Sequence, residues 1–317
     1  MKTLRSIKSL VKKSGLPGYY YVKRNSLVYH FEKLLLLKSP VLFSKYRYKK
    51  FHNRSIDLKN PVLFNDKLVW LNLFWKHPLK TQCGDKFAMR SYVEEHGFGH
   101  LLPTLLGVYN QGSEIDFSVL PSKFVLKCTH GSGFNIICLN KAELDIREAR
   151  QKLDNWLKTD YSHNACELHY KQMEPRIICE QFLDDNSGNQ PTDYKVYCFS
   201  GKAHCIMVAR DRDVHGHTDK YEFYDLEWEN RLPYIDENTD INTDPATHKP
   251  NAFHEMIEAA EALSEPFPFV RMDFYDINGK AYLGEMTFTP SGCIYNDCTD
   301  LAQTVLGSLI LLPLPIW

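Results

Sequence analysis

The sequence predicts an α+β fold in which helices come first and antiparallel strand hairpins follow. Apolar residues recur at helical spacing over residues 61–97. Strand-like runs then flank two short turns, Ser200-Gly201 and Asn278-Gly279, and Asn-Gly is a favoured two-residue hairpin turn. A chain of 317 residues is long enough to bury more than one core, so we expect two or three packed parts.

Residues 1–60 are predicted to form a basic, helical N-terminal extension. Residues 1–54 hold 14 Lys or Arg and one acid, Glu32, for a local charge of +13; the remainder holds 24 basic and 38 acidic residues, or −14. Nucleic acid, an anionic membrane face or an acidic polymer would each complement the basic segment.

The expected location is the cytoplasm, with peripheral contact at the inner membrane face left open. No apolar run reaches the roughly 18 residues of a membrane-spanning helix, and no apolar stretch follows the basic N-terminus as in a secretory signal. Nine cysteines are scattered without a Cys-x-x-Cys pair, which favours reduced thiols over disulfides or zinc.

Residues 61–120 are predicted to form an N-terminal helical subdomain. Asn65 is a suitable N-cap for a helix whose apolar residues Leu68, Leu71 and Trp75 share a face. A second helix is expected from Asp85 to a C-terminal glycine, Gly97.

Two further subdomains are predicted over residues 121–183 and 184–317. The first is expected to contain two strands around a glycine loop, a helix and a third strand, at 123–128, 135–139, 143–157 and 176–183. The second is expected to contain two hairpins and a helix, at 193–209, 251–263 and 269–286.

The last hairpin carries the most informative side chains. Strand alternation places Arg271 and Asp273 on one face, and the turn brings Glu285 and Thr287 opposite them. Adjacent carboxylates repel unless a cation lies between them, and Mg²⁺ binds in proteins through one or two carboxylates plus substrate phosphates. The alternative is an exposed ionic ladder of Arg271, Asp273 and Glu285.

Two other segments are ambiguous when taken alone. Lys127 before the loop Gly131-Ser132-Gly133 could hold phosphates, although an ordinary turn would give the same pattern. Residues 210–213, Arg-Asp-Arg-Asp, could grip an acceptor carboxylate through Arg210 and Arg212. The same segment contains Asp211-x-Asp213, an acidic signature of many glycosyltransferases, or could be a salt-bridged loop.

The order of these motifs resembles the ATP-grasp superfamily, and in texture its TupA-like branch, whose members act in teichuronopeptide and capsular polysaccharide synthesis. The segments that carry the resemblance run from about residue 60 to residue 300: Phe64-Asn-Asp-Lys-Leu-Val-Trp70, Asp85-Lys-Phe-Ala-Met-Arg-Ser-Tyr-Val93, Lys127-Cys-Thr-His-Gly-Ser-Gly133, Asp193-Tyr-Lys195 and Gly284-Glu-Met-Thr-Phe-Thr-Pro290. The resemblance implies an ATP-grasp fold, in which two α+β subdomains grip ATP.

The resemblance also implies a role for each matching residue, with ATP and Mg²⁺ as cofactors. The residues implied to contact the nucleotide, including a loop that closes over its phosphates and an adenine hinge, are Lys86, Lys127, Thr129, Gly131, Ser132, Gly133, Glu180, Gln181, Leu183, Asp193 and Lys195. Arg271 and Lys127 are the implied catalytic groups. Arg210 and Arg212, which follow a predicted strand, are further catalytic candidates for holding the acceptor. Asp273, Glu285 and Thr287 are the implied metal ligands, with Thr287 standing where the family commonly has Asn.

The function implied is a carboxylate–amine ligase that forms an amide through an acyl phosphate and releases ADP. Its acceptor would be a uronic-acid-type sugar of a surface polysaccharide, its donor an amine or amino acid, and no nucleic-acid partner is implied. The alternatives are a ligase acting on free amino acids, a glycosyltransferase or sugar kinase of polysaccharide synthesis, and a non-catalytic glycan- or lipid-binding protein.

Overall fold

The computed structural model describes residues 27–185, 190–210, 220–235, 247–296 and 298–314. Two compact units are present, each built from two stretches of chain. Unit 1 comprises the described part of Met1–Arg47 together with Thr104–Phe182, and unit 2 comprises Tyr48–Pro103 together with the described part of Leu183–Trp317. The mixed α+β class predicted from the sequence is confirmed. The subdomain boundaries expected at residues 60, 120 and 183 stay predictions.

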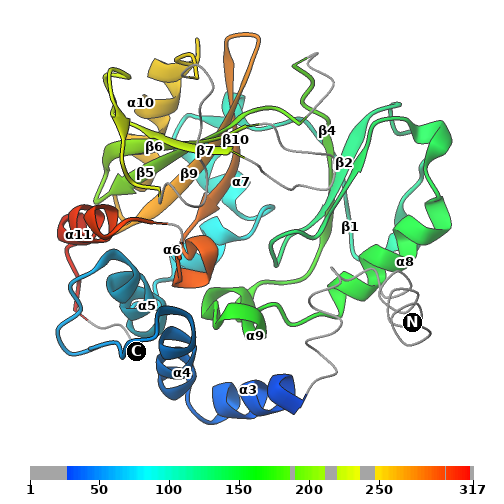
Figure 1. The fold of residues 1–317 in the computed structure, drawn as a ribbon. Helices are drawn as coiled ribbons and strands as arrows, with labels where there is room; N and C mark the ends of the chain where they lie inside the picture. The colour runs from blue at the N-terminus through cyan, green and yellow to red at the C-terminus, as the bar shows by residue number, and fades with distance from the viewer. Residues whose placement is uncertain (1–26, 186–189, 211–219, 236–246, 297, 315–317) are drawn as a thin grey trace, which may run out of the picture. The chain divides into compact units, whose positions relative to one another are not determined.

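Unit 1 is built around a four-stranded antiparallel sheet in the order β1-β4-β2-β3 (Figure 1). Its strands are β1 (Leu105–Tyr109), β2 (Phe124–Cys128), β3 (Asn135–Cys138) and β4 (Ile177–Gln181). Its helices are α3 (Leu27–Lys38), α8 (Ile146–Leu157) and α9 (Ser162–Ala165), with short 3₁₀ turns at Gly112–Glu114, Lys141–Glu143 and Leu168–Gln172. Helix α4 (Pro40–His52) begins in unit 1 and ends in unit 2.

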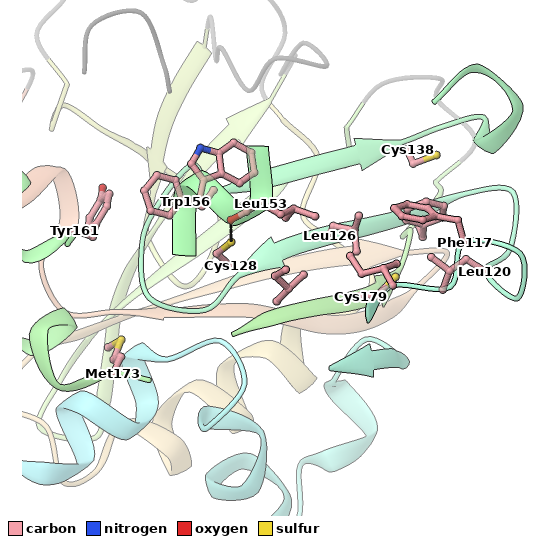
Figure 2. Packing of buried hydrophobic residues seen from close by; sticks show 14 of the residues in the cluster. Phe117, Leu120, Leu126, Cys128, Cys138, Leu153, Trp156, Tyr161, Met173 and Cys179 are labelled. Atoms are coloured by element: carbon pink, nitrogen blue, oxygen red, sulfur yellow. Dashed lines mark hydrogen bonds between the residues drawn. The ribbon is translucent and has the colours of Figure 1, made fainter. Parts of the chain in front are cut away.

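One face of this sheet forms the core of unit 1. Phe124, Leu126 and Cys128 alternate on β2 and pack with Leu153 and Trp156 of α8. Figure 2 shows this layer, with the Cys128 thiol directed at the Leu153 carbonyl. Alternation sends the intervening residues of β2, including Lys127, to the opposite face.

Unit 2 is built around a six-stranded antiparallel sheet in the order β10-β9-β5-β6-β7-β8. Its strands are β5 (Asp193–Phe199), β6 (Lys202–Arg210), β7 (Lys220–Tyr224), β8 (Arg231–Leu232), β9 (Val270–Ile277) and β10 (Lys280–Thr287). Its helices are α5 (Phe64–Phe74), α6 (Pro78–Gly84), α7 (Met89–Glu95), α10 (Phe253–Ser264) and α11 (Asp300–Leu309), with 3₁₀ turns at Gly99–Leu101 and Pro290–Cys293. Helix α10 packs on one face of the sheet, against β5 and β6 (Figure 1).

Both predicted hairpins of unit 2 are confirmed, and each has a register shift beyond its turn, between Tyr197 and Cys198 in the first and between Leu283 and Glu285 in the second. Ser200 and Gly201 have φ of 48° and 79°, and Asn278 and Gly279 have φ of 55° and 83°. Two consecutive positive φ values define the turn whose twist matches that of antiparallel strands, and Asn and Gly tolerate them best. In the β9–β10 hairpin the turn sets the pairing as far as Leu283 with Phe274, and the shift at Gly284 then places Glu285 opposite Asp273.

Two predicted helix starts are wrong. The N-cap of α5 is Leu63 rather than Asn65, because the Asn65 amide is engaged at long range, donating to the Tyr295 carbonyl at 3.0 Å and accepting from the Tyr295 amide at 3.2 Å. Helix α7 begins at Met89 rather than Asp85, since the Asp85 carboxylate accepts from the backbone amides of Phe87 and Ala88 and holds a turn there.

Candidate active site

The face of the unit 2 sheet opposite α10 carries a group of charged side chains at its β5–β9–β10 end. Lys195, Asp273 and Glu285 are direct partners across the three adjacent strands, so their side chains share this face. Arg271 and Thr287 form the next pair on the same face. The predicted proximity of Asp273 to Glu285 is confirmed by this register. Together these side chains form the charged cluster, which consists of Lys86, Asp193, Lys195, Arg271, Asp273, Glu285 and Thr287.

Asp273 lies at the centre of the charged cluster and is 5% exposed. Arg271 donates to both of its oxygens, from Nε to Oδ1 and from Nη2 to Oδ2, each at 2.7 Å. Lys195 Nζ donates to Oδ2 at 2.8 Å and to Asp193 Oδ2 at 2.7 Å. Burial alone would lower the pKa of Lys195, but Asp193 and Asp273 raise it, so the ammonium stays charged.

Glu285 is the more accessible carboxylate, with 26% of its side chain exposed. Lys86 Nζ lies 3.4 Å from its Oε2, and Thr287 Oγ1 donates to its Oε1 at 2.8 Å. Burial would raise the pKa of the Glu285 carboxyl, but Lys86, the Thr287 hydroxyl and the more distant cations of the charged cluster lower it to about 2. Glu285 is therefore ionised across the physiological range.

The side chain of Arg271 is fixed on all sides. Besides its two bonds to Asp273, Nη2 donates to Thr287 Oγ1 at 3.3 Å and Nη1 donates to the Tyr295 hydroxyl at 3.1 Å. The Tyr295 hydroxyl in turn lies 2.8 Å from that of Tyr197. A guanidinium held this firmly is preorganised, which is the property required of a group that stabilises charge during a reaction.

The sequence did not single out the two tyrosines. Tyr197 could have been found, because it continues the alternation Asp193-x-Lys195-x-Tyr197 along β5. Tyr295 had no local signal, since only the folded chain brings it beside Arg271.

The oxygen atoms of Glu285 and Thr287 are better placed to bind Mg²⁺ than those of Asp273. Carboxylate and hydroxyl oxygens are hard donors of the kind Mg²⁺ prefers, and Glu285 and Thr287 supply them at the accessible side. Both Asp273 oxygens already accept from cations, so a metal could gain Asp273 only if Arg271 or Lys195 moved. Within the described ranges, no three His, Cys, Asp or Glu side chains are gathered as a ready metal site.

Unit 1 carries the predicted phosphate-binding lysine on the sheet face away from α8. Lys127 Nζ lies 2.7 Å from Glu180 Oε2, and this pairing joins β2 to β4. The lysine is 19% exposed and the glutamate 5%, so the ammonium is the accessible partner. Gln181 is exposed at the end of β4, and Leu183 follows it at the start of the second stretch of unit 2.

The glycine loop is fixed at its base and open at its tip. Thr129 is fully buried and its hydroxyl donates to the Glu174 carbonyl at 3.2 Å, so it supports the base of the loop. Cys128 N donates to the Phe134 carbonyl at 2.8 Å and closes the loop. Ser132 and Gly133 are exposed, and Gly133 has φ of 74° with open space where a Cβ would lie.

Of the two predicted acceptor arginines, Arg210 is not brought to the charged cluster. Arg210 alternates with Ala209 on β6, and Ala209 pairs with Asp193, so Arg210 lies on the opposite face of the sheet. Its Nε is 3.6 Å from the buried carboxylate of Glu222. Arg212, Asp211 and Asp213 lie outside the described residues.

Comparison with known proteins identifies a family. The model of the TupA-like ATP-grasp family matches residues 66–311. A comparison with curated protein sequences gives no match.

Solved ligase structures share a distant likeness with the chain. The D-alanine–D-alanine ligase of Bacillus anthracis is 14% identical with a TM-score of 0.38, over 78% of this chain and 69% of that one. The D-alanine–D-alanine ligase of Helicobacter pylori is 16% identical with a TM-score of 0.41, over 74% and 60%. The ATP-grasp ligase PsnB, complexed with its minimal precursor, Mg and ADP, is 13% identical with a TM-score of 0.39, over 77% and 64%. The chain thus spans between three fifths and seven tenths of the length of these relatives.

Proposed function

The chain belongs to the TupA-like ATP-grasp family, and from this premise we propose that it is an ADP-forming ligase joining a carboxylate to an amine. The observation that carries the proposal is the charged cluster, where a preorganised arginine lies beside an accessible, ionised carboxylate. In such a reaction the substrate carboxylate attacks the γ-phosphorus of ATP, ADP leaves, and the resulting acyl phosphate is attacked by the amine with release of phosphate. Positioning and electrostatics supply most of the rate of phosphoryl transfer.

In unit 2, Arg271 is assigned to the oxygens of the transferring phosphoryl group. Asp273 and Tyr295 hold its guanidinium in place, and Lys195 balances the charge of Asp273. Glu285 and Thr287 are the residues that would hold Mg²⁺, with Asp273 joining them if its cations shift. When bound, the metal would neutralise phosphate charge and orient the transferring group. Lys86 beside Glu285 would then be released to contact a phosphate oxygen.

In unit 1, Lys127 is assigned to a nucleotide phosphate and Glu180 to its orientation. The 2.7 Å pairing fixes the lysine on its sheet face, and the exposed loop tip at Ser132 and Gly133 offers backbone amides to phosphate oxygens. Gln181 and Leu183, at the end of β4 and just after it, are assigned to the adenine ring.

The acceptor is proposed to be a carboxylated, uronic-acid-type sugar of a capsular or surface polysaccharide or its precursor, and the donor an amine or amino acid. Resemblance to the TupA-like branch is the support for this substrate class. A cytoplasmic location with peripheral contact at an anionic membrane or acidic polymer accompanies it. The described helices include none that is long and apolar enough to cross a membrane.

A thermal-shift comparison of nucleotides tests the proposal against the glycosyltransferase alternative. ATP with Mg²⁺ should raise Tm, whereas UDP-sugars with Mg²⁺ or Mn²⁺ should not, because only a bound ligand stabilises the native state by mass action. Lys127→Ala should diminish the ATP shift. Lys152→Ala, which removes an exposed lysine on α8 of the same unit, is the matched control and should retain it. Stabilisation by UDP-sugars alone would replace the ligase proposal by the alternative.

A further inference from the structure

A pocket of about 600 Å³ lies wholly within unit 2. Its lining comes from the end of α4, the start of α5, Pro233 and Ile235, the residues Tyr295, Asn296, Cys298 and Thr299 before α11, and the first turn of α11. Small-molecule sites typically measure 300–1,000 Å³, so the space suits a ligand of one or two sugar rings. Tyr295 lines this pocket and also contacts Arg271 through its hydroxyl, which joins the pocket to the charged cluster.

Gln303 lines this pocket, and its side-chain amide has an unsatisfied hydrogen-bond donor. The residue is 6% exposed, and its Oε1 accepts from the Asn65 backbone amide at 3.0 Å, which fixes the orientation of the side-chain amide. No described residue accepts a hydrogen bond from the buried Nε2. Leaving such a donor unpaired costs roughly 1–3 kcal/mol, and an acceptor oxygen of a ligand would remove that cost.

The other lining groups define the chemistry of the ligand. The Arg54 guanidinium is 43% exposed and adds a second donor, while the exposed carboxylate of Asp300 adds an acceptor. Leu63, Pro233 and Ile235 contribute apolar surface. Donors and acceptors interspersed with apolar patches match a sugar ring, whose hydroxyls accept and donate and whose C–H faces are apolar.

We propose that this pocket binds a polyhydroxylated, sugar-like ring, with ring hydroxyls accepting from Gln303 Nε2 and Arg54 and donating to Asp300. In the proposed ligase this ring belongs to the carboxylate-bearing acceptor, a role that rests on the proposed function; the binding itself does not require ATP. Tyr295 is a positioning residue, because Asn65 fixes its main chain on both sides while its hydroxyl bonds to Arg271.

A titration of the full chain without nucleotide tests the proposal. D-Glucuronate and D-glucose should give saturable binding by saturation-transfer NMR, and acetate, which lacks the ring, should give none. Gln303→Glu keeps an acceptor for the Asn65 amide but replaces the donor, so both sugars should bind at least tenfold more weakly. Thr304→Glu adds the same charge at the exposed neighbour on α11 and should bind both sugars as the wild type does.

Asp300→Asn provides a second variant at an exposed position, in case Gln303→Glu lowers Tm. Asp300→Asn should weaken the binding of both sugars severalfold and leave Tm unchanged. Unaltered affinity in Gln303→Glu and Asp300→Asn, or no saturable sugar binding by the wild type, would overturn the pocket assignment. Stabilisation by ATP is measured on the same samples, so its retention would leave the proposed function standing when the pocket assignment falls. Conversely, sugar binding without ATP stabilisation would remove only the proposed function.

Discussion

At the scale of single residues, the Asp273 carboxylate has two roles that the sequence alone does not separate. It is an implied metal ligand, and it is also the acceptor of two buried ion pairs. Two neighbouring carboxylates suggest repulsion, and removing one would then be expected to relieve strain. The structure reverses that expectation, because Arg271 and Lys195 already neutralise Asp273 in a largely buried place. Removing one partner of a buried ion pair leaves uncompensated charge, which typically costs about 3–5 kcal/mol.

Asp273→Asn should therefore lose both activity and stability. Turnover should fall by about 10²-fold or more, equivalent to roughly 2.7 kcal/mol of barrier. Urea denaturation should show a lower free energy of unfolding, because Arg271 and Lys195 lose a charged acceptor. Glu258→Gln, which removes an exposed carboxylate from α10 of the same unit, is the control. An Asp273→Asn enzyme with wild-type turnover would contradict the assignment of the charged cluster as the catalytic centre.

The lowered pKa of Glu285 predicts that the free energy of unfolding depends on pH. Its pKa is about 2 in the folded chain against 4.5 ordinarily, so its ionised form stabilises the fold above pH 4.5, and this contribution is lost as pH falls from 4.5 toward 2. At about 1.4 kcal/mol per pKa unit, the loss is on the order of 3 kcal/mol as an upper value. Urea unfolding at pH 6 and pH 3 should therefore show a smaller loss in Glu285→Gln than in wild type. Equal losses would mean that Lys86 and Thr287 do not stabilise the ionised carboxylate.

At the scale of elements, the β9–β10 hairpin shows how far local sequence determines the site. The Asn278-Gly279 turn with regular alternation would pair Asp273 with Gly284, and the β-bulge between Leu283 and Glu285 moves the register by one residue, so that Asp273 faces Glu285. The position of β5 beside β9 is not local, so the contribution of Lys195 could not be predicted from the hairpin. For the same reason Arg210 was assigned to the acceptor, although strand pairing puts it on the other face.

The glycine loop of unit 1 has one position where only glycine fits. A Cβ at Gly131 would meet ring carbons of Phe134 and Tyr161 at 2.9 Å, and both rings belong to the core. Gly131→Ala should destabilise the chain by about 1–3 kcal/mol, as overpacking of a core does. Ser132→Ala, at the exposed neighbour, should leave the thermal unfolding midpoint unchanged. Equal midpoints for Gly131→Ala and wild type would show that the loop base tolerates displacement.

At the scale of the whole molecule, the basic N-terminal segment predicts interaction with an anionic surface. Residues 1–54 carry a charge of +13, and helix α3 exposes apolar side chains at every third position, Val28, Phe31, Leu34 and Leu37. Apolar and basic groups on one helix favour reversible binding at a membrane surface. Sedimentation with vesicles containing phosphatidylserine should show binding that weakens steeply with salt.

A double variant tests the contribution of the apolar side chains of α3, because it removes two of them while keeping the charge of the segment. Phe31→Ser with Leu34→Ser should weaken vesicle binding at low salt, whereas Val119→Ser with Leu139→Ser, which removes two exposed apolar side chains elsewhere in unit 1, should not. Binding that is absent, or that does not respond to salt, would contradict a peripheral role for this segment.

The central claim is that the chain transfers the γ-phosphoryl group of ATP to a carboxylate, and product analysis tests it most directly. The full chain is incubated with ATP, Mg²⁺, D-glucuronate and hydroxylamine, an amine that traps acyl phosphates as hydroxamates, and the phosphorus products are followed by ³¹P NMR. We expect ADP, inorganic phosphate and hydroxamate in equal amounts, and we expect Arg271→Ala to form all three more slowly than the wild type. AMP with pyrophosphate, or phosphate retained on the sugar without any need for the amine, would contradict it.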